Sequence, residues 1–201
     1  MKKILMFVIL PLAIIGLAYA VIASIQEPIK FGKLKGQREK VGIQRLKDIR
    51  TLQVAYKSKY GKFCPSIDSL ISFYKNGQIT IVRQIGSFDD SLAVAQKRVH
   101  RDSIKINVKD TLLKREDFNP DSLRTIPFAG GQLVQIQTVI KSVSGVDVPL
   151  FEAAMPYEAL LKDLNRQLIV NLWHERTDSN RYPGLKVGSV DSPNNNAGNW
   201  E

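Results

Sequence analysis

The stretch RLKDIRTLQVAYKSKYGKFCPSIDSL, Arg45–Leu70, decides the architecture that we expect for this chain. Apolar residues recur every three or four positions through its first half, which is the spacing of one face of an α-helix. Gly61 follows as the glycine at which helices commonly end. Pro65 and Ser66 then open a short helix, expected over Ile67–Lys75. The stretch therefore predicts a long amphipathic helix, a tight turn and a second helix.

The apolar face of the long helix is predicted to pack against other parts of the protein. This expected packing face contains Leu46, Ile49, Tyr56 and Tyr60. Tyr56 and Tyr60 lie four residues apart and should pack together, while the neighbouring lysines point outward. The alternation of aromatic and basic residues also fits a platform for single-stranded nucleic acid, which is an alternative interpretation.

Upstream of this helix, the segment Ile4–Ile25 is an uncharged apolar run of 22 residues. About 20 such residues are needed to cross a bilayer as a helix, so we expect residues 1–26 to be a transmembrane anchor. Ala18-Tyr19-Ala20 has the form of a signal-peptidase site. Cleavage there is the alternative, and it would release a soluble periplasmic binding protein.

Small residues recur every four positions within the apolar run, at Gly16, Ala20 and Ser24. They share one helix face, where small side chains let a partner helix approach closely in lipid. Farther along, Pro28 and Gly32 predict an interruption of the helix where it leaves the membrane.

The excess positive charge of the chain lies in its first 62 residues. This segment contains 13 Lys and Arg against 3 Asp and Glu, whereas the remaining residues contain 16 of each kind. The distribution favours a membrane surface over nucleic acid, because each cation near anionic headgroups contributes roughly 1 kcal/mol. The cations expected to contact headgroups are Lys30, Lys33, Lys35, Arg38 and Lys40.

The orientation in the membrane rests on two opposing signals. The five cations after the apolar run would keep the large domain in the cytoplasm by the positive-inside rule. The short start Met1-Lys2-Lys3 before an export-like apolar core favours the opposite. We expect an inner-membrane, single-pass protein with a periplasmic head. An anchored cytoplasmic nucleic-acid binder is the remaining alternative.

After Gly77 the hydrophobic period changes to that of β-strands. The expected fold class is α+β, with a mostly antiparallel sheet and short helices in a head domain, residues 63–190. Residues 27–62 form the basic amphipathic helix, and residues 191–201 a flexible tail. We expect strands over Gln78–Ile85, Ser103–Asp110, Gln132–Ile140, Val146–Ala153, Arg166–Glu175 and Gly184–Val190, and a helix from Pro156 to about Leu164.

The residues that usually carry chemistry form no motif in this sequence. His100 and His174 lack metal-ligand spacing, and each is interpreted as a surface histidine. Asp89 and Asp90 fit a helix N-cap better than a carboxylate pair. Cys64 is the only cysteine, and it is interpreted as a small apolar residue in the turn. We predict no catalytic residue, no metal and no cofactor.

The arrangement resembles that of type IV pilins and type II secretion pseudopilins. The resemblance lies in an apolar N-terminal helix that runs into an amphipathic helix ending at a Tyr-Gly turn before a proline. It is also similar to single-span, pilin-like bacterial membrane proteins with an RLKDIRxxQxAYK motif. The matching positions are Arg45–Arg50, Gln53, Ala55–Lys57, Tyr60–Phe63, Pro65 and Asp68–Leu70.

This resemblance implies a pilin-like stalk carrying an α+β head. It also implies a non-enzymatic structural or assembly role in the bacterial cell envelope. The partners that follow are the lipid bilayer and either other proteins or further copies of the chain, bound through the stalk helix. No nucleic acid is expected.

Overall fold

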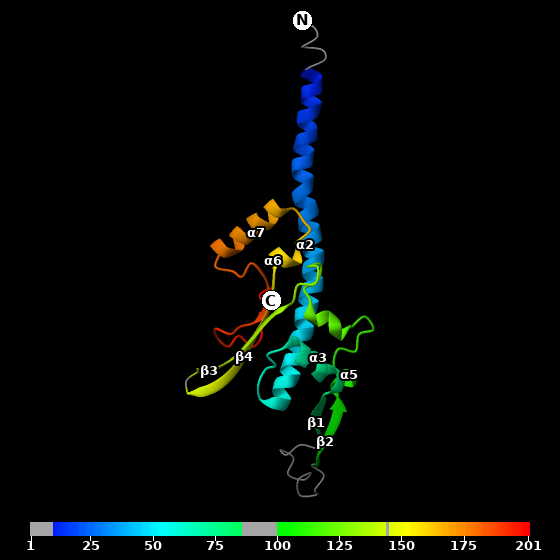
Figure 1. The fold of residues 1–201 in the computed structure, drawn as a ribbon, viewed down its shortest axis with the longest axis vertical. Coiled ribbons are helices and arrows are strands. Elements are labelled where there is room, and N and C mark those ends of the chain that lie inside the picture. Colours follow the sequence, from blue (N-terminus) through cyan, green and yellow to red (C-terminus); the bar gives the residue numbers. More distant parts are fainter. Residues whose placement is uncertain (1–9, 86–99, 144) are drawn as a thin grey trace.

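The computed structural model describes residues 10–85, 100–143 and 145–201. Its dominant element is helix α2, Leu10–Tyr60, which is 51 residues long and carries the rest of the chain on its C-terminal half (Figure 1). At 1.5 Å per residue it extends for about 75 Å. The interruption expected at Pro28 and Gly32 is wrong, because α2 continues through both residues. Proline removes one backbone hydrogen bond, which a long helix that has already nucleated tolerates.

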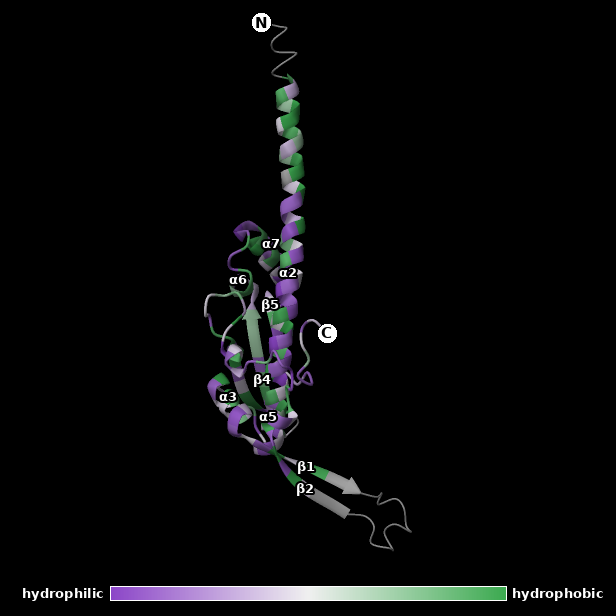
Figure 2. Cartoon of the chain, turned by 90° about the vertical axis from the view of Figure 1, so that its right-hand side faces the viewer, coloured by the Kyte–Doolittle hydropathy of each residue, from purple (hydrophilic) through white to green (hydrophobic). Residues whose placement is uncertain are grey.

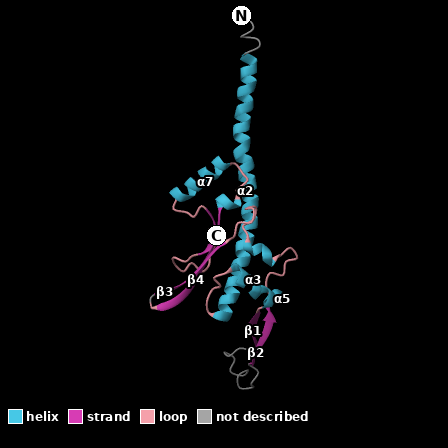
Figure 3. Ribbon diagram, viewed as in Figure 1, coloured by secondary structure: helices cyan, strands magenta, loops and turns pink. Residues whose placement is uncertain are grey.

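Two antiparallel sheets and several short helices make up the head, which confirms the α+β class. The first sheet is a ribbon of β1, Gln78–Ile85, and β2, His100–Asn107. The second has the order β3-β4-β5, with β4 as its central strand. Its strands are Gln135–Val143, Val146–Pro156 and Gly184–Gly188. Figure 3 shows β3 and β4 side by side as an antiparallel pair. The ribbon projects from the end of the head farthest from the N-terminus of α2 (Figure 2).

The hydrophobic core lies where α2 packs against the three-stranded sheet and the helix α3, Ile67–Asn76. From α2 it receives Leu46, Ile49 and Leu52, whose side chains are completely buried. Strand β4 supplies Phe151, and the ring of Phe63 lies 4.7 Å from the Phe151 ring, centroid to centroid. The turn after α2 is therefore part of the core, and it fixes the helix to the sheet.

The segment predicted as a strand over Arg166–Glu175 is instead helix α7, Arg166–Asp178. Its buried residues, Ile169 and Leu172, are three positions apart, which is a helical spacing. The side chain of Asn165 caps its first turn by accepting hydrogen bonds from two backbone N–H groups. The Asn165 cap and the burial of one side of the segment stabilise a helix and not a strand.

Smaller differences concern the ends of elements. The predicted strand Ser103–Asp110 stops at Asn107, because Val108 is buried and starts the short helix α5, Val108–Thr111. The helix expected from Pro156 is only one turn long, α6, Tyr157–Leu160. A 3₁₀ turn, η2, covers Pro120–Arg124. The predicted Asp89-Asp90 cap lies outside the described residues.

The last residues of the chain fold back onto the head. Gly198 bridges to Val187 of β5, and the Asn199 side chain donates a hydrogen bond to the carbonyl of Gly184 at 2.9 Å. Glu201 pairs with Arg50 of α2 at 2.7 Å. Residues 191–201 were predicted to be a flexible tail, and several of them contact the head or α2. The carbonyl of Asp191 also accepts a hydrogen bond from Lys141 at 2.9 Å.

Candidate functional site: the junction of the long helix and the head

The candidate site is the junction, which we define as the face of α2 from Phe31 to Tyr60 together with the head residues that contact it. The most buried polar contact of the junction is made by the side chain of Gln53. The amide Nε2 donates to the carbonyl of Cys64 at 2.7 Å, and Oε1 accepts from the N–H of Cys64 at 2.8 Å. A buried turn without such partners would leave two backbone groups unsatisfied. Cys64 itself is buried, and its thiol donates to the carbonyl of Ser66.

A nearly buried carboxylate holds the middle of the junction. Asp48 is 4% exposed and accepts two hydrogen bonds from the guanidinium of Arg115, at 2.8 and 3.0 Å. This bidentate pairing raises the pKa of Arg115. Arg45, one turn away, donates to the carbonyl of Thr125, and burial lowers the pKa of its guanidinium. The charged residues of the opening motif thus bind loops of the head.

The predicted packing face is buried to different degrees along α2. Leu46 and Ile49 are completely buried, Tyr56 is half-buried and Tyr60 is exposed. The rings of Tyr56 and Tyr60 lie 4.5 Å apart, and Tyr56 also meets Phe73 of α3 at 5.2 Å. The aromatic pair therefore closes the lower end of the junction.

The structure divides the five predicted headgroup cations into two groups. Lys30, Lys33 and Lys40 are exposed. Arg38 instead pairs with Asp163 and also donates to the carbonyl of Leu160 at 3.2 Å. Lys35 is half-buried, 3.6 Å from Glu39. Two of the five cations are therefore occupied by contacts within the protein.

The Arg38 pair also sets the ionisation of its partner. The Arg38 guanidinium lowers the pKa of Asp163 to about 2, although the Asp163 side chain is 62% exposed. The ring of Phe128 lies 4.7 Å below the guanidinium. This contact is the charged part of the junction at the end nearest the apolar run.

Sequence reasoning missed the role of the three acidic residues in the basic segment. Glu27 accepts a hydrogen bond from the Asn165 side chain, and Glu39 accepts one from the hydroxyl of Tyr157. Asp48, described above, is the third. All three therefore receive a donor from the head. Their rarity among 13 cations is a signal that could have identified them.

Burial and the contact with Glu39 raise the pKa of the Tyr157 hydroxyl well above its ordinary value. The hydroxyl therefore stays protonated and keeps donating to Glu39 over the physiological pH range. Arg176 of α7 lies at 3.5 Å from the same hydroxyl oxygen. One tyrosine thus connects α2, α6 and α7.

Glycine has different surroundings in the two halves of α2. A Cβ added at Gly42 would lie 2.8 Å from a methyl group of Leu185, so this side chain would have to move to admit a larger residue. A Cβ at Gly16 would meet nothing within 4 Å. Gly16, Ala20 and Ser24, the small residues predicted to pack against another membrane helix, are all exposed in the single chain.

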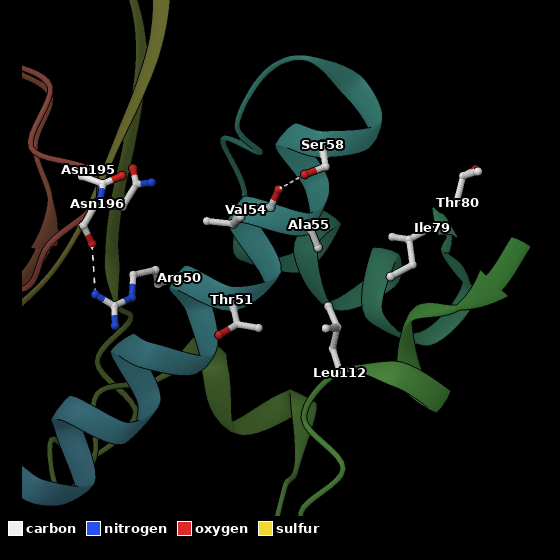
Figure 4. A pocket seen from close by; sticks show the side chains of 10 residues that line it. All are labelled: Arg50, Thr51, Val54, Ala55, Ser58, Ile79, Thr80, Leu112, Asn195 and Asn196. Carbon is white, nitrogen blue, oxygen red and sulfur yellow. Dashed lines mark hydrogen bonds between the residues drawn. The ribbon is translucent and has the colours of Figure 1, made fainter. Parts of the chain in front are cut away.

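The described surface also has grooves beside the junction. One of about 600 Å³ lies between α2, β1 and the tail, and it is lined mainly by aliphatic, hydroxyl and amide side chains (Figure 4). Its one charged side chain, Arg50, donates to the carbonyl of Asn196 at 3.3 Å. Within residues 10–85, 100–143 and 145–201, no three His, Cys, Asp or Glu side chains gather to hold a metal. His174 is exposed, and the side chain of His100 is outside the described part.

The contacts of the junction attach the α+β head to one long helix. No family model, no curated protein and no solved structure matches the chain.

Proposed function

We propose that the chain is a single-pass membrane protein of the bacterial cell envelope that acts as a structural or assembly component. In this proposal it works without catalysis, in the manner of pilins and pseudopilins. The apolar run holds it in the inner membrane, and the C-terminal half of α2 is a stalk that presents the head in the periplasm. The observation that carries the proposal is the contrast in burial along the single helix α2.

The N-terminal half of α2 supports the anchor because it exposes apolar side chains on every side. An 18-residue window of this helix is apolar enough to cross a membrane, and none of it is buried within the protein. Leu12 and Tyr19 are more than 70% exposed. A continuous apolar surface of this kind is unstable in water and requires a membrane or a protein partner.

The outer face of the stalk supports a protein partner or a second copy of the chain. Leu34 and Val41 lie seven residues apart on one side of α2 and remain about two-fifths exposed. Seven-residue spacing of apolar side chains is typical of helix–helix seams. In the apolar run, a Cβ at Gly16 would meet nothing within 4 Å, so close approach of a second helix is sterically allowed there.

The test of this proposal is the side of the membrane on which the head lies. Alkaline phosphatase fused after Glu201 is expected to be active, because the enzyme folds only after export. The fusion should also stay in the membrane fraction after an alkaline wash. An inactive fusion with an active cytoplasmic reporter at the same position would overturn the periplasmic head.

A soluble periplasmic protein is the second candidate, and Ala18-Tyr19-Ala20 is the observation that favours it. Intact mass of the chain purified from membranes separates the two. We expect a mass that includes the residues up to Ala20. If the mature chain begins after Ala20 and occurs in the soluble fraction, the protein is secreted and not anchored.

A further inference from the structure

The part of the head nearest the apolar run is the turn between α6 and α7 together with α7 itself (Figure 1). Two contacts hold this region against α2. Asn165, the cap of α7, bonds to Glu27, and Asp163 pairs with Arg38. The position of α7 along α2 is therefore fixed by contacts at both ends of the stretch of α2 from Glu27 to Arg38.

This position has a consequence if α2 spans a bilayer, so the inference rests on the proposed anchoring. Glu27 follows Ile25 by two residues, which is about 3 Å along the helix axis. The headgroup layer on each side of the hydrocarbon core is about 5–7 Å thick. Asn165, bonded to Glu27, then lies at the depth of the headgroups, and α7 starts there.

One exposed face of α7 combines basic, aliphatic and aromatic side chains. Arg166, Val170 and Trp173 follow one another at spacings of four and three residues and so share a face. Together with Lys162 they line one groove of about 620 Å³. Trp173 is 44% exposed and Val170 is 37% exposed. Tryptophan with flanking Lys and Arg is the residue set that anchors helices at headgroup level.

The charges around this groove favour an anionic partner. Lys162 and Arg166 are exposed and have no carboxylate partner among the described residues. Asp163 is engaged by Arg38, while Glu158 of α6 is the one acidic side chain in the groove. Lys30 and Lys33 of α2 are also exposed and lie within two turns of Glu27.

We propose that α7 is a second membrane contact, in which Lys162 and Arg166 bind anionic phospholipid headgroups and Trp173 lies in the headgroup layer. The head then rests on the bilayer surface instead of standing away from it on the stalk. This orientation directs the β1–β2 ribbon away from the membrane (Figure 2). The ribbon, with the exposed Ile81 and Ile104 paired across its strands, becomes the part of the head that is farthest from lipid.

The two tryptophans of the chain provide a matched test. Trp200→Phe leaves Trp173 as the only tryptophan, and it removes no hydrogen bond because Trp200 Nε1 has none. Trp173→Phe leaves Trp200, which lines a pocket with Ile43. Ile43 is 18 residues beyond Ile25, about 27 Å along α2. The full chain is reconstituted in vesicles of phosphatidylcholine and phosphatidylglycerol that contain a lipid with a nitroxide on its headgroup.

We expect strong quenching of Trp173 fluorescence and little quenching of Trp200. Changing Lys162 or Arg166 to Gln should each lower the equilibrium constant between heads on and off the bilayer about fivefold, because one cation near an anionic surface contributes roughly 1 kcal/mol. Vesicles of phosphatidylcholine alone should have a similar effect. If Trp173 quenching is unchanged both in the Gln variants and in vesicles of phosphatidylcholine alone, the anionic headgroup is not the partner.

Flotation of the same vesicles separates this inference from the anchoring on which it rests. If the chain floats with the vesicles and Trp173 is quenched no more than Trp200, the contact of α7 is wrong and the anchor stands. If the chain does not float, the anchor itself is wrong. Circular dichroism of each variant verifies that the fold is retained.

Discussion

The two halves of α2 differ in what surrounds them, although they belong to one continuous helix. From Leu10 to Lys30 every described side chain is exposed, whereas from Phe31 to Tyr60 one face is buried under the head. Hydropathy changes at the same place (Figure 2). The tendency of the sequence to form a helix therefore does not explain the difference in side-chain exposure between the two halves. The C-terminal half is stabilised by packing, and the N-terminal half carries apolar surface that the head does not cover.

The largest expected effect comes from cutting a core side chain in the packed half. Leu52→Ala should lower the free energy of unfolding by about 3 kcal/mol, since it removes a fully buried side chain and leaves a cavity. Val54→Ala, two residues on and 43% exposed, should change it by less than about 0.5 kcal/mol. Urea unfolding of the full chain in detergent measures both. Equal losses would contradict the one-sided burial of α2.

A smaller loss is expected when the buried amide of the junction is removed. Gln53→Leu keeps the approximate volume but leaves the N–H and the carbonyl of Cys64 without partners, at a cost of about 2 kcal/mol. Gln37→Leu is the matched control, because Gln37 is an exposed residue of the same helix. If the two variants unfold at the same urea concentration, the Gln53–Cys64 contact does not stabilise the turn.

The charged end of the junction should depend on acid. Asp163 has a lowered pKa of about 2, so its pairing with Arg38 stabilises the protein above the ordinary aspartate pKa near 4 and is lost as the pH falls from 4 to 2. Because the side chain is largely exposed, the contribution is about 1 kcal/mol or less. Asp163→Asn should remove this part of the pH dependence of unfolding. If the unfolding free energy of the variant depends on pH as strongly as that of the wild type, the pH dependence comes from other carboxylates.

The smallest effect on stability is expected for a substitution in the N-terminal half of α2. Such a substitution should instead change how strongly copies of the chain associate in lipid. Gly16→Ile adds a side chain that meets nothing in the single chain, so unfolding of the head should not change. If Gly16, Ala20 and Ser24 pack against another membrane helix, the same substitution should weaken self-association in lipid by about tenfold. Crosslinking or energy transfer between labelled copies measures this. Unchanged association would remove the small-residue face from the account.

Local pattern predicted the parts of the fold that depend on neighbouring residues. The three-to-four spacing before Gly61 predicted the C-terminal half of α2, and the Pro65-Ser66 start predicted α3. Helix α7 was missed because a run such as Leu-Ile-Val-Asn-Leu-Trp satisfies both strand and helix periods over so few residues. Its cap, Asn165, would have decided the question.

The junction was predicted only in part, for a physical reason. Leu46 and Ile49 could be assigned to a buried face from spacing alone. The sequence pattern could not show which polar residues of α2 contact which residues of the head. Glu39 and Tyr157 are 118 residues apart, and Glu27 and Asn165 are 138 apart. Contacts at that separation depend on how the sheet docks onto α2. For the same reason, Arg38 was predicted to bind headgroups, although Asp163 and Leu160 occupy it.

The measurement that tests the central claim most directly is a spin-label scan along α2 in lipid vesicles. Single cysteines are placed from Leu12 to Ser58 in a Cys64→Ala chain, and collisions with oxygen and with a water-soluble nickel complex are recorded. The account predicts that labels before Ile25 meet oxygen and exclude nickel at every position. Beyond Phe31 accessibility should oscillate with a period of 3.6 residues. Equal nickel access throughout the N-terminal half would contradict the claim that one helix serves as both anchor and stalk.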